Sequence, residues 1–371
     1  MSGGRWYERC IAHYDEKVID FFTCHFEDEE RNCIVIAGAG FDPRSAALVT
    51  QLSAILGDRL ATVLIKEERP DPESTLVNKA AENLENIREH CADLSVHEVE
   101  IFADDGAVVG GRNAIHALKG VDFTGFTDVI VDMSALSMGV SYPLILYIFQ
   151  LLEQVDSDIN LHLALLSNPE LDSAIESEPN DKMSNIHGFP MSDLYGDSDK
   201  ALLWLPLLSE KKQQLHKIIY DAIKPHDTCP ILPFPAEDPK KGDRIASRVF
   251  DLIQADWGGP LDNEWELDPR NFVYADERKP LDIYRTILRI NAERKPVFET
   301  FGGSTIVLSP MGSKIPTLGA LMAAIEGKFP VVYVESIAYN VDWTKINTIE
   351  QGKSRMSHIW LCGDAYLKAD N

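Results

Sequence analysis

The chain has 371 residues, and at roughly 150 residues per domain this length predicts two to three domains. Hydrophobic residues make up 45% of it and charged residues 25%, which is typical of a folded protein and excludes a disordered chain. Its 35 basic residues are outnumbered by 59 acidic ones, giving a formal net charge of −24. A surface this acidic repels nucleic-acid phosphates and anionic lipids, so we expect neither broad nucleic-acid binding nor membrane docking.

Two further features predict a cytoplasmic protein. The six cysteines include no CxxC pair, and a chain of this length does not need disulfides for its stability. The first ten residues lack the apolar run of a secretory signal. The apolar segment 129–152 contains Asp132 and Pro143, and we predict that it forms a buried strand, a turn and a helix rather than a membrane span.

The elements predicted in chain order are alternating helices and strands. A helical pattern at 5–26 comes first. Short apolar runs then predict buried strands, with helical patterns between them, at 33–37, 61–65, 96–102, 128–132 and 160–166. After a polar segment the alternation resumes, with strands predicted at 202–208, 229–234, 271–274, 305–308 and 331–335. Strands that alternate with helices over short connections favour an α/β fold with parallel sheets.

We therefore predict two Rossmann-like parallel-sheet units. The predicted parts are an N-terminal helical segment at 1–30, a first unit at 31–175, a polar linker at 176–200, a second unit at 201–345 and a C-terminal tail at 346–371. Both units close with a strand, a polar turn, an apolar helix and a further strand. Either an internal duplication or the independent recurrence of a common fold would produce this likeness.

The turn after the first predicted strand, GAGFDPRS at 38–45, is the first candidate ligand site. Gly38 and Gly40 would let a ligand approach the backbone, and the following helix would offer free N–H groups to an anion. Asp42 or Ser45 could cap that helix, and Arg44 could bind a phosphate. The third glycine of the dinucleotide signature is missing. The alternative is a tight strand–helix turn in which Arg44 pairs with a carboxylate.

The second candidate site is the turn 309–314, SPMGSK, at another predicted strand end. Its Ser309, Gly312, Ser313 and Lys314 suit a phosphate or the edge of a nucleotide, although the Walker A pattern is absent. The alternative is a glycine-bearing turn with a solvated lysine.

Glu277 and Arg278 follow the predicted strand 271–274 and form a third candidate position. We place them on the ligand-side rim of the second unit, because ligands of parallel sheets bind beyond the carboxyl ends of the strands. The alternative is a pair of solvated salt bridges beside a helix that begins at a proline.

A family resemblance rests on three segments. STIVLSPMGSKIPTLGALMAAIEGKFPVVYVE at 304–335 resembles the late strand, turn, helix and strand of CRISPR-associated Rossmann-fold (CARF) sensor domains. GAGFDPRSAALVTQL at 38–52 resembles their first strand and ligand loop, and ATVLIKEERPDP at 61–72 resembles their second strand. The layout in two units is similar to that of SAVED domains, which fuse two such units and sense cyclic oligonucleotides in antiviral systems.

The resemblance implies a set of residues that contact the ligand: Gly40, Asp42, Arg44, Gly312, Ser313 and Lys314. The chain departs from the family pattern in two places. One glycine rather than two precedes Ser-Lys, and the corresponding turn of the first unit, SALSMG at 134–139, has no lysine. If the chain is a sensor, its effector is expected to be another chain.

We therefore predict a nucleotide- or oligonucleotide-binding sensor or regulatory subunit of an antiviral defence system, with a protein effector or a second copy as its partner. One alternative is a Mg²⁺-dependent nucleotide hydrolase, because acidic residues end several predicted strands, at Glu67, Glu68, Asp104, Asp105 and Asp132. The other is a structural adaptor. The ten histidines form no HExxH or HxH motif, so no metal-ligating residue is assigned. Turnover of nucleotides separates the hydrolase from the sensor.

Overall fold

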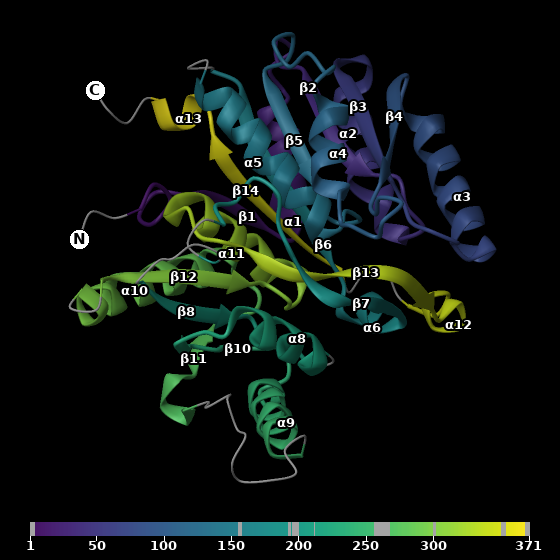
Figure 1. Ribbon diagram of the computed structural model, residues 1–371. Helices are drawn as coiled ribbons and strands as arrows, with labels where there is room; N and C mark the ends of the chain where they lie inside the picture. Colours follow the sequence, from purple (N-terminus) through teal and green to yellow (C-terminus); the bar gives the residue numbers. More distant parts are fainter. Residues whose placement is uncertain are drawn as a thin grey trace. The chain divides into compact units, whose positions relative to one another are not determined.

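The computed structural model describes residues 4–154, 158–191, 194, 200–210, 212–255, 268–299, 302–349 and 354–367. The chain divides into two compact units. Unit 1 comprises residues 1–8 and 179–336, and unit 2 comprises residues 9–178 and 337–371. Both contain strands that alternate with helices (Figure 1), and the large, mostly parallel sheet of unit 2 confirms the α/β class.

Unit 2 is built on a seven-stranded sheet. Its strands, in spatial order, are β1 (Ile11–Tyr14), β14 (Arg355–Cys362), β6 (Asn160–Ser167), β5 (Asp128–Asp132), β2 (Cys33–Gly38), β3 (Leu60–Glu68) and β4 (Asp93–Glu100). The five strands from β2 to β6 are parallel, and their spatial order corresponds to the 3-2-1-4-5 order of Rossmann folds. The order reverses between β2 and β5, so the topological switch point lies between these two strands.

The inner strands of unit 2 are covered on both faces. Cys33, Val35 and Ala37 of β2 pack in one hydrophobic core with the helices α1 (Glu16–His25), α2 (Ala47–Leu56) and α3 (Ser74–His90). The alternating residues Ile34 and Ile36 are also buried, which explains why β2 reads as a continuous apolar run. The remaining helices of unit 2 are α4 (Gly110–Leu118), α5 (Met138–Gln154), α6 (Pro169–Ala174), α12 (Trp343–Ile346) and α13 (Asp364–Leu367), with short 3-10 turns η1 (Pro43–Ser45) and η2 (Gly57–Arg59).

Two strands of the unit 2 sheet come from segments that the sequence analysis assigned to other structures. β1 lies in the predicted helical segment 1–30, and β14 lies in the predicted tail 346–371. β14 pairs antiparallel with β6 and with β1, and Figure 1 shows it, in yellow, running between them. No described helix is long and apolar enough to cross a membrane.

Unit 1 repeats the strand order in smaller sheets. β8 (Ala201–Pro206) pairs in parallel with β12 (Ser304–Ser309) and β9 (Asp227–Thr228), and β10 (Ile231–Pro233) pairs in parallel with β11 (Val273–Ala275). Parallel bridges from Leu207 to Ile231 and from Leu308 to Val331 extend this arrangement on both sides. The resulting order again corresponds to 3-2-1-4-5. An internal duplication stays a prediction.

The helices of unit 1 are α8 (Gln213–Ile223), α9 (Lys241–Ala255), α10 (Pro280–Phe298) and α11 (Lys314–Gly327), with a 3-10 turn η3 (Pro269–Asn271). The chain passes from one unit to the other within β7 (Ile175–Asn185), which lies in the predicted linker 176–200, and again within β13 (Val332–Val341). β7 and β13 pair with each other.

Candidate functional site

The loops that follow β2 and β5 meet at the switch point of unit 2. A Cβ atom at Gly38, the last residue of β2, would lie 3.0 Å from the backbone carbon of Ala135, so this glycine permits close packing of the two loops. A Cβ atom at Gly40 would meet no other atom within 4 Å. Ser45 is buried, and its Oγ lies 3.5 Å from the Gly40 carbonyl oxygen. Gly38 therefore closes the loop junction, and Gly40 leaves backbone open to an approaching group.

Arg44 is held by two carboxylates. Its Nε donates to Asp42 Oδ1 at 2.9 Å, one terminal nitrogen donates to Asp42 Oδ2 at 2.6 Å, and the other donates to Asp172 Oδ1 at 2.7 Å. The Arg44 side chain is only 3% exposed. Burial alone would lower its pKa, but the charges and hydrogen bonds of the two carboxylates outweigh that effect and raise the pKa. This is the Arg–carboxylate pair that the sequence analysis gave as the alternative to a phosphate ligand.

The other polar groups near the switch point are also bonded to one another. At the end of β3, Glu67 accepts hydrogen bonds from the backbone N–H of Ser137 at 2.7 Å and from Arg69 at 3.0 Å. At the end of β5, Asp132 accepts from the backbone N–H of Ser134 at 2.9 Å and from the Ser134 hydroxyl. We call the carboxyl ends of β2, β3 and β5, with the loops 38–45 and 132–138, the switch-point edge.

The carboxylates expected to hold Mg²⁺ do not gather into a metal site. Within the described residues, one group of three potential ligands has atoms within 4.8 Å of one another, and it lies elsewhere in unit 2. It includes none of the acidic residues singled out in the sequence: Glu67, Glu68, Asp104, Asp105 and Asp132. The hydrolase alternative stays a prediction.

The turn after β12 in unit 1 has a structural hydroxyl at its start. Ser309 is fully buried, and its Oγ accepts a hydrogen bond from Trp204 Nε1 at 2.9 Å. A Cβ atom at Gly312 would make ordinary van der Waals contact with Leu207 Cβ, at 3.6 Å. Ser313 stands at the N-cap of α11 without a capping hydrogen bond, and Lys314 begins the helix and is partly exposed. Ser309 is therefore part of the buried core, whereas Gly312, Ser313 and Lys314 lie at the partly exposed surface of this turn.

Glu277 and Arg278 have different surroundings. Glu277 is buried and accepts hydrogen bonds from the backbone N–H of Glu237 at 2.9 Å and from Lys241 Nζ at 2.8 Å. It therefore ties the end of β11 to the start of α9. Arg278 is exposed and lies 3.4 Å from a carboxylate oxygen of Asp276.

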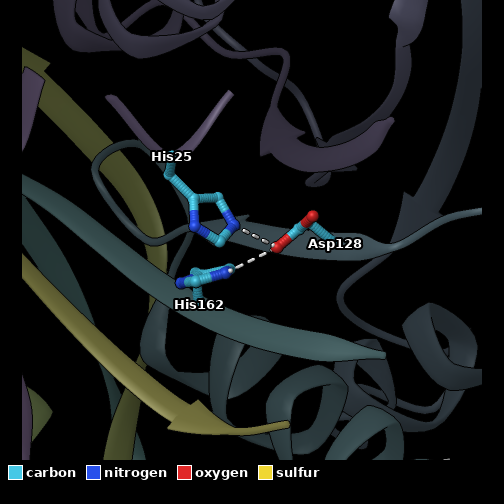
Figure 2. A group of neighbouring side chains, drawn as sticks. All are labelled: His25, Asp128 and His162. Atoms are coloured by element: carbon cyan, nitrogen blue, oxygen red, sulfur yellow. Dashed lines mark hydrogen bonds and ion pairs between the residues drawn. The ribbon is translucent and has the colours of Figure 1, made fainter. Parts of the chain in front are cut away.

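A buried polar cluster formed by His25, Asp128 and His162 lies at the other end of β5 (Figure 2). Asp128 is the first residue of β5, His162 lies in β6, and His25 ends α1. The Nε2 atoms of His25 and His162 both point at Asp128 Oδ1, at 2.8 Å and 3.0 Å. The side chains of Asp128 and His162 are 0% exposed, and that of His25 is nearly buried. We call these three residues the histidine–aspartate cluster.

Neighbouring groups fix the Asp128 carboxylate. Its Oδ2 accepts from the Thr127 hydroxyl at 2.6 Å and lies 3.6 Å from an Arg31 terminal nitrogen. Its Oδ1 also accepts from Asn160 Nδ2 at 3.0 Å. Burial would raise the pKa of Asp128, but hydrogen bonds from the imidazoles, chiefly that of His162, lower it below its ordinary value. Asp128 is therefore ionised although it is buried.

A row of imidazoles extends from this carboxylate. His162 Nδ1 lies 2.9 Å from His358 Nε2, and His358 Nδ1 lies 3.0 Å from His13 Nδ1. Burial lowers the pKa of His162 and of His358, so both rings are neutral. Because ionised Asp128 only accepts, His162 must carry its proton on Nε2, His358 on Nε2 and His13 on Nδ1. The four side chains therefore form one continuous row of hydrogen bonds, from His13 through His358 and His162 to Asp128.

The sequence analysis missed this cluster because its members come from distant parts of the chain. The signal available in the sequence was one histidine inside each of two apolar segments, LHLALL at 161–166 and SHIWLC at 357–362. A polar side chain at such a position must find a buried partner. The spacing of residues along the sequence does not show which side chain is that partner.

The comparisons with known proteins identify no family. No protein-family model matches the chain. A search of curated proteins also finds no match.

Proposed function

We propose that this protein binds a nucleotide-type ligand at the switch-point edge of unit 2 and acts as a sensor or regulatory subunit. The observation that carries the proposal is the reversal of strand order between β2 and β5 at the open backbone of Gly40. Ligands of open α/β sheets bind beyond the carboxyl ends of the strands at this reversal. A protein effector or a second copy of the chain would receive the signal, as the resemblance to SAVED domains implies.

The charges at this edge favour recognition of the nucleoside part of the ligand. Four carboxylates and two guanidinium groups at this edge and directly beside it carry a formal charge of −2: Asp42, Glu67, Asp132, Asp172, Arg44 and Arg69. Lys66 and Glu68 at the end of β3 form an ion pair and add no net charge. Because Arg44 already binds two carboxylates, we no longer assign the phosphate to it. Carboxylate oxygens can accept hydrogen bonds from ribose hydroxyls and base N–H groups. Glu67 lies next to the last residue of β3, the second parallel strand, and an acidic residue at the end of this strand binds ribose in dinucleotide-binding folds.

The proposal is binding without turnover. The carboxylates of the edge accept hydrogen bonds from backbone N–H groups and arginines and do not converge on a common point. Metal-assisted hydrolysis needs carboxylates that share one cation. We therefore favour a sensor over the hydrolase alternative, with intact ligand recovered after binding.

Substitution of Gly40 tests this proposal. Gly40→Val fills the open side of the loop without meeting protein atoms within 4 Å at Cβ, so the fold should tolerate it. Gly120→Val is the matched control, because Gly120 is equally open and follows α4, away from the loops after β2 and β5. Calorimetric titration with a panel of ribonucleotides and cyclic oligonucleotides would compare both variants with the unmodified protein.

We expect saturable binding of at least one member of the panel, weakened about tenfold or more by Gly40→Val, which corresponds to roughly 1.4 kcal/mol. Gly120→Val should bind normally, both variants should keep the unmodified melting temperature, and chromatography should recover the nucleotide intact. Equal affinity of the Gly40 variant would contradict the placement of the site. Mg²⁺-dependent products would favour the hydrolase, and a panel without any binding would favour the adaptor.

A further inference from the structure

We propose that the histidine–aspartate cluster is a binding site for a divalent transition metal of the zinc class. Its three potential ligand atoms come from three separate elements and lie within 4.8 Å of one another. Two imidazole nitrogens and one carboxylate oxygen form a ligand set that zinc and iron sites use, with a further position left for water. The site is independent of the proposed nucleotide site.

The distances suit a metal after a small adjustment. The two Nε2 atoms of His25 and His162 are 2.8 Å and 3.0 Å from Asp128 Oδ1. Zinc bonds of about 2.0–2.2 Å in a tetrahedral site place neighbouring ligand atoms roughly 3.3 Å apart. A shift of a few tenths of an ångström therefore brings these two distances to those of a metal site, and the two Nε2 atoms lie within 4.8 Å of each other.

The surrounding groups orient the ligands as outer partners do in metal sites. Thr127 and Arg31 engage Asp128 Oδ2, whereas Oδ1 faces the two imidazoles and accepts from Asn160 Nδ2 at 3.0 Å. The second nitrogen of His162 is held by His358. Such contacts to the far side of a ligand fix its orientation and raise its basicity.

The local charge also favours a cation. The side chains of Asp128 and His162 are both fully buried. Among the described residues, the permanently cationic group within 4 Å of Asp128 is Arg31, at 3.6 Å. The same Arg31 nitrogen lies 3.3 Å from His25 Nε2, so a metal on His25 would replace this contact. Arg31 also lies close to Asp364 and Asp28, at 2.9 Å and 3.8 Å. A buried carboxylate with so little compensating charge is stabilised by a bound cation.

Metal binding would reverse the row of imidazoles. A metal on His162 Nε2 requires the ring proton on Nδ1, which then donates to His358 Nε2. His358 in turn carries its proton on Nδ1 and donates to His13 Nδ1, and His13 holds its own proton on Nε2. Each ring keeps one proton, because the proton lost from His162 Nε2 is balanced by one taken up at His13 Nε2. An ion bound unspecifically at the surface would not produce this change of tautomer, so the change distinguishes the proposed site.

The experiment uses the full chain after removal of metals with a chelator. Titration calorimetry and elemental analysis with Zn²⁺ should show one ion per chain. His25→Ala, at the end of α1, should weaken binding by more than about 100-fold, since losing an outer partner alone typically costs 10–100-fold. Cys24→Ser is the matched control, because Cys24 is an exposed neighbouring thiol and should not affect the affinity.

A second measurement uses the unmodified protein, so it tests the proposal even if the His25→Ala variant does not fold. Nitrogen-15 chemical shifts of the imidazoles in the unmodified protein should report Nε2–H at His162 and His358 without Zn²⁺ and Nδ1–H with it. Unchanged shifts, no bound Zn²⁺, or undiminished binding by His25→Ala would each overturn the proposal. Gly40→Val should bind Zn²⁺ normally, so failure of the metal site and failure of the nucleotide site are distinguishable.

Discussion

The Arg44→Ala variant should destabilise unit 2, because it removes the cation between two carboxylates. Arg44 makes hydrogen bonds of 2.6–2.9 Å to Asp42 and Asp172 and is 3% exposed. Breaking a buried pair by removing one partner costs about 3–5 kcal/mol. Asp172 is 31% exposed and keeps part of its hydration, so we expect the lower end, about 3 kcal/mol.

This loss corresponds to a fall in melting temperature of about 6–12 °C for a unit of this size. Differential scanning calorimetry measures it as a shift of the transition in which unit 2 unfolds.

The chain contains its own control for this variant. Asp268, Pro269 and Arg270 repeat the Asp-Pro-Arg tripeptide and its short 3-10 turn, with Arg270 Nε 3.0 Å from Asp268 Oδ1. Arg270 is 89% exposed, so water screens its ion pair. Arg270→Ala should therefore leave the melting temperature unchanged within error. Equal effects of the two substitutions, or a stable Arg44→Ala variant with weakened nucleotide affinity, would refute the structural role of Arg44.

Two further predictions concern unit 1. Burial lowers the pKa of His216 to about 3. Below about pH 6.5 the unfolded chain therefore binds a proton that the folded chain does not. As the pH decreases from about 6.5 to about 3, the free energy of unfolding should fall by about 1.4 kcal/mol per pH unit. His216→Phe should remove this pH dependence. Urea unfolding of the unmodified protein and the variant at pH 7.5 and 5.5 would detect the difference, and an equal loss of stability in both proteins would contradict the prediction. Ser309→Ala leaves the buried tryptophan N–H without its acceptor and should cost about 1–3 kcal/mol. Ser313→Ala should cost nothing measurable in the same unfolding assay, and equal losses would contradict the assignment.

The sequence predicted well those elements that have a strong local signal. β2 was predicted at 33–37 and is found at Cys33–Gly38, since a strand covered on both faces is apolar throughout. β14 was assigned to a tail. It is a single strand at the end of the chain whose place in the sheet depends on antiparallel pairing with β6, about 190 residues earlier. Local patterns do not encode such a pairing.

The same limit applies to the candidate sites. The sequence offered two roles for Arg44, and the structure shows the pairing with carboxylates because it brings Asp172 from α6 to the turn. Ligand contact by Arg44 stays a prediction. The histidine–aspartate cluster needs α1, β5 and β6 in their folded positions, and no motif spacing reports that arrangement. The turns at strand ends were nevertheless found from the sequence, because glycines and polar residues after apolar runs mark them.

Amide hydrogen exchange with and without the bound nucleotide tests the central claim most directly. We predict that the ligand slows exchange in peptides that cover residues 38–45 and 132–138, the two loops of the switch-point edge. Peptides around Gly120, after α4, should exchange at the same rate in both samples. Protection confined to other segments, or no protection under saturating ligand, would contradict a ligand site at the junction of β2 and β5.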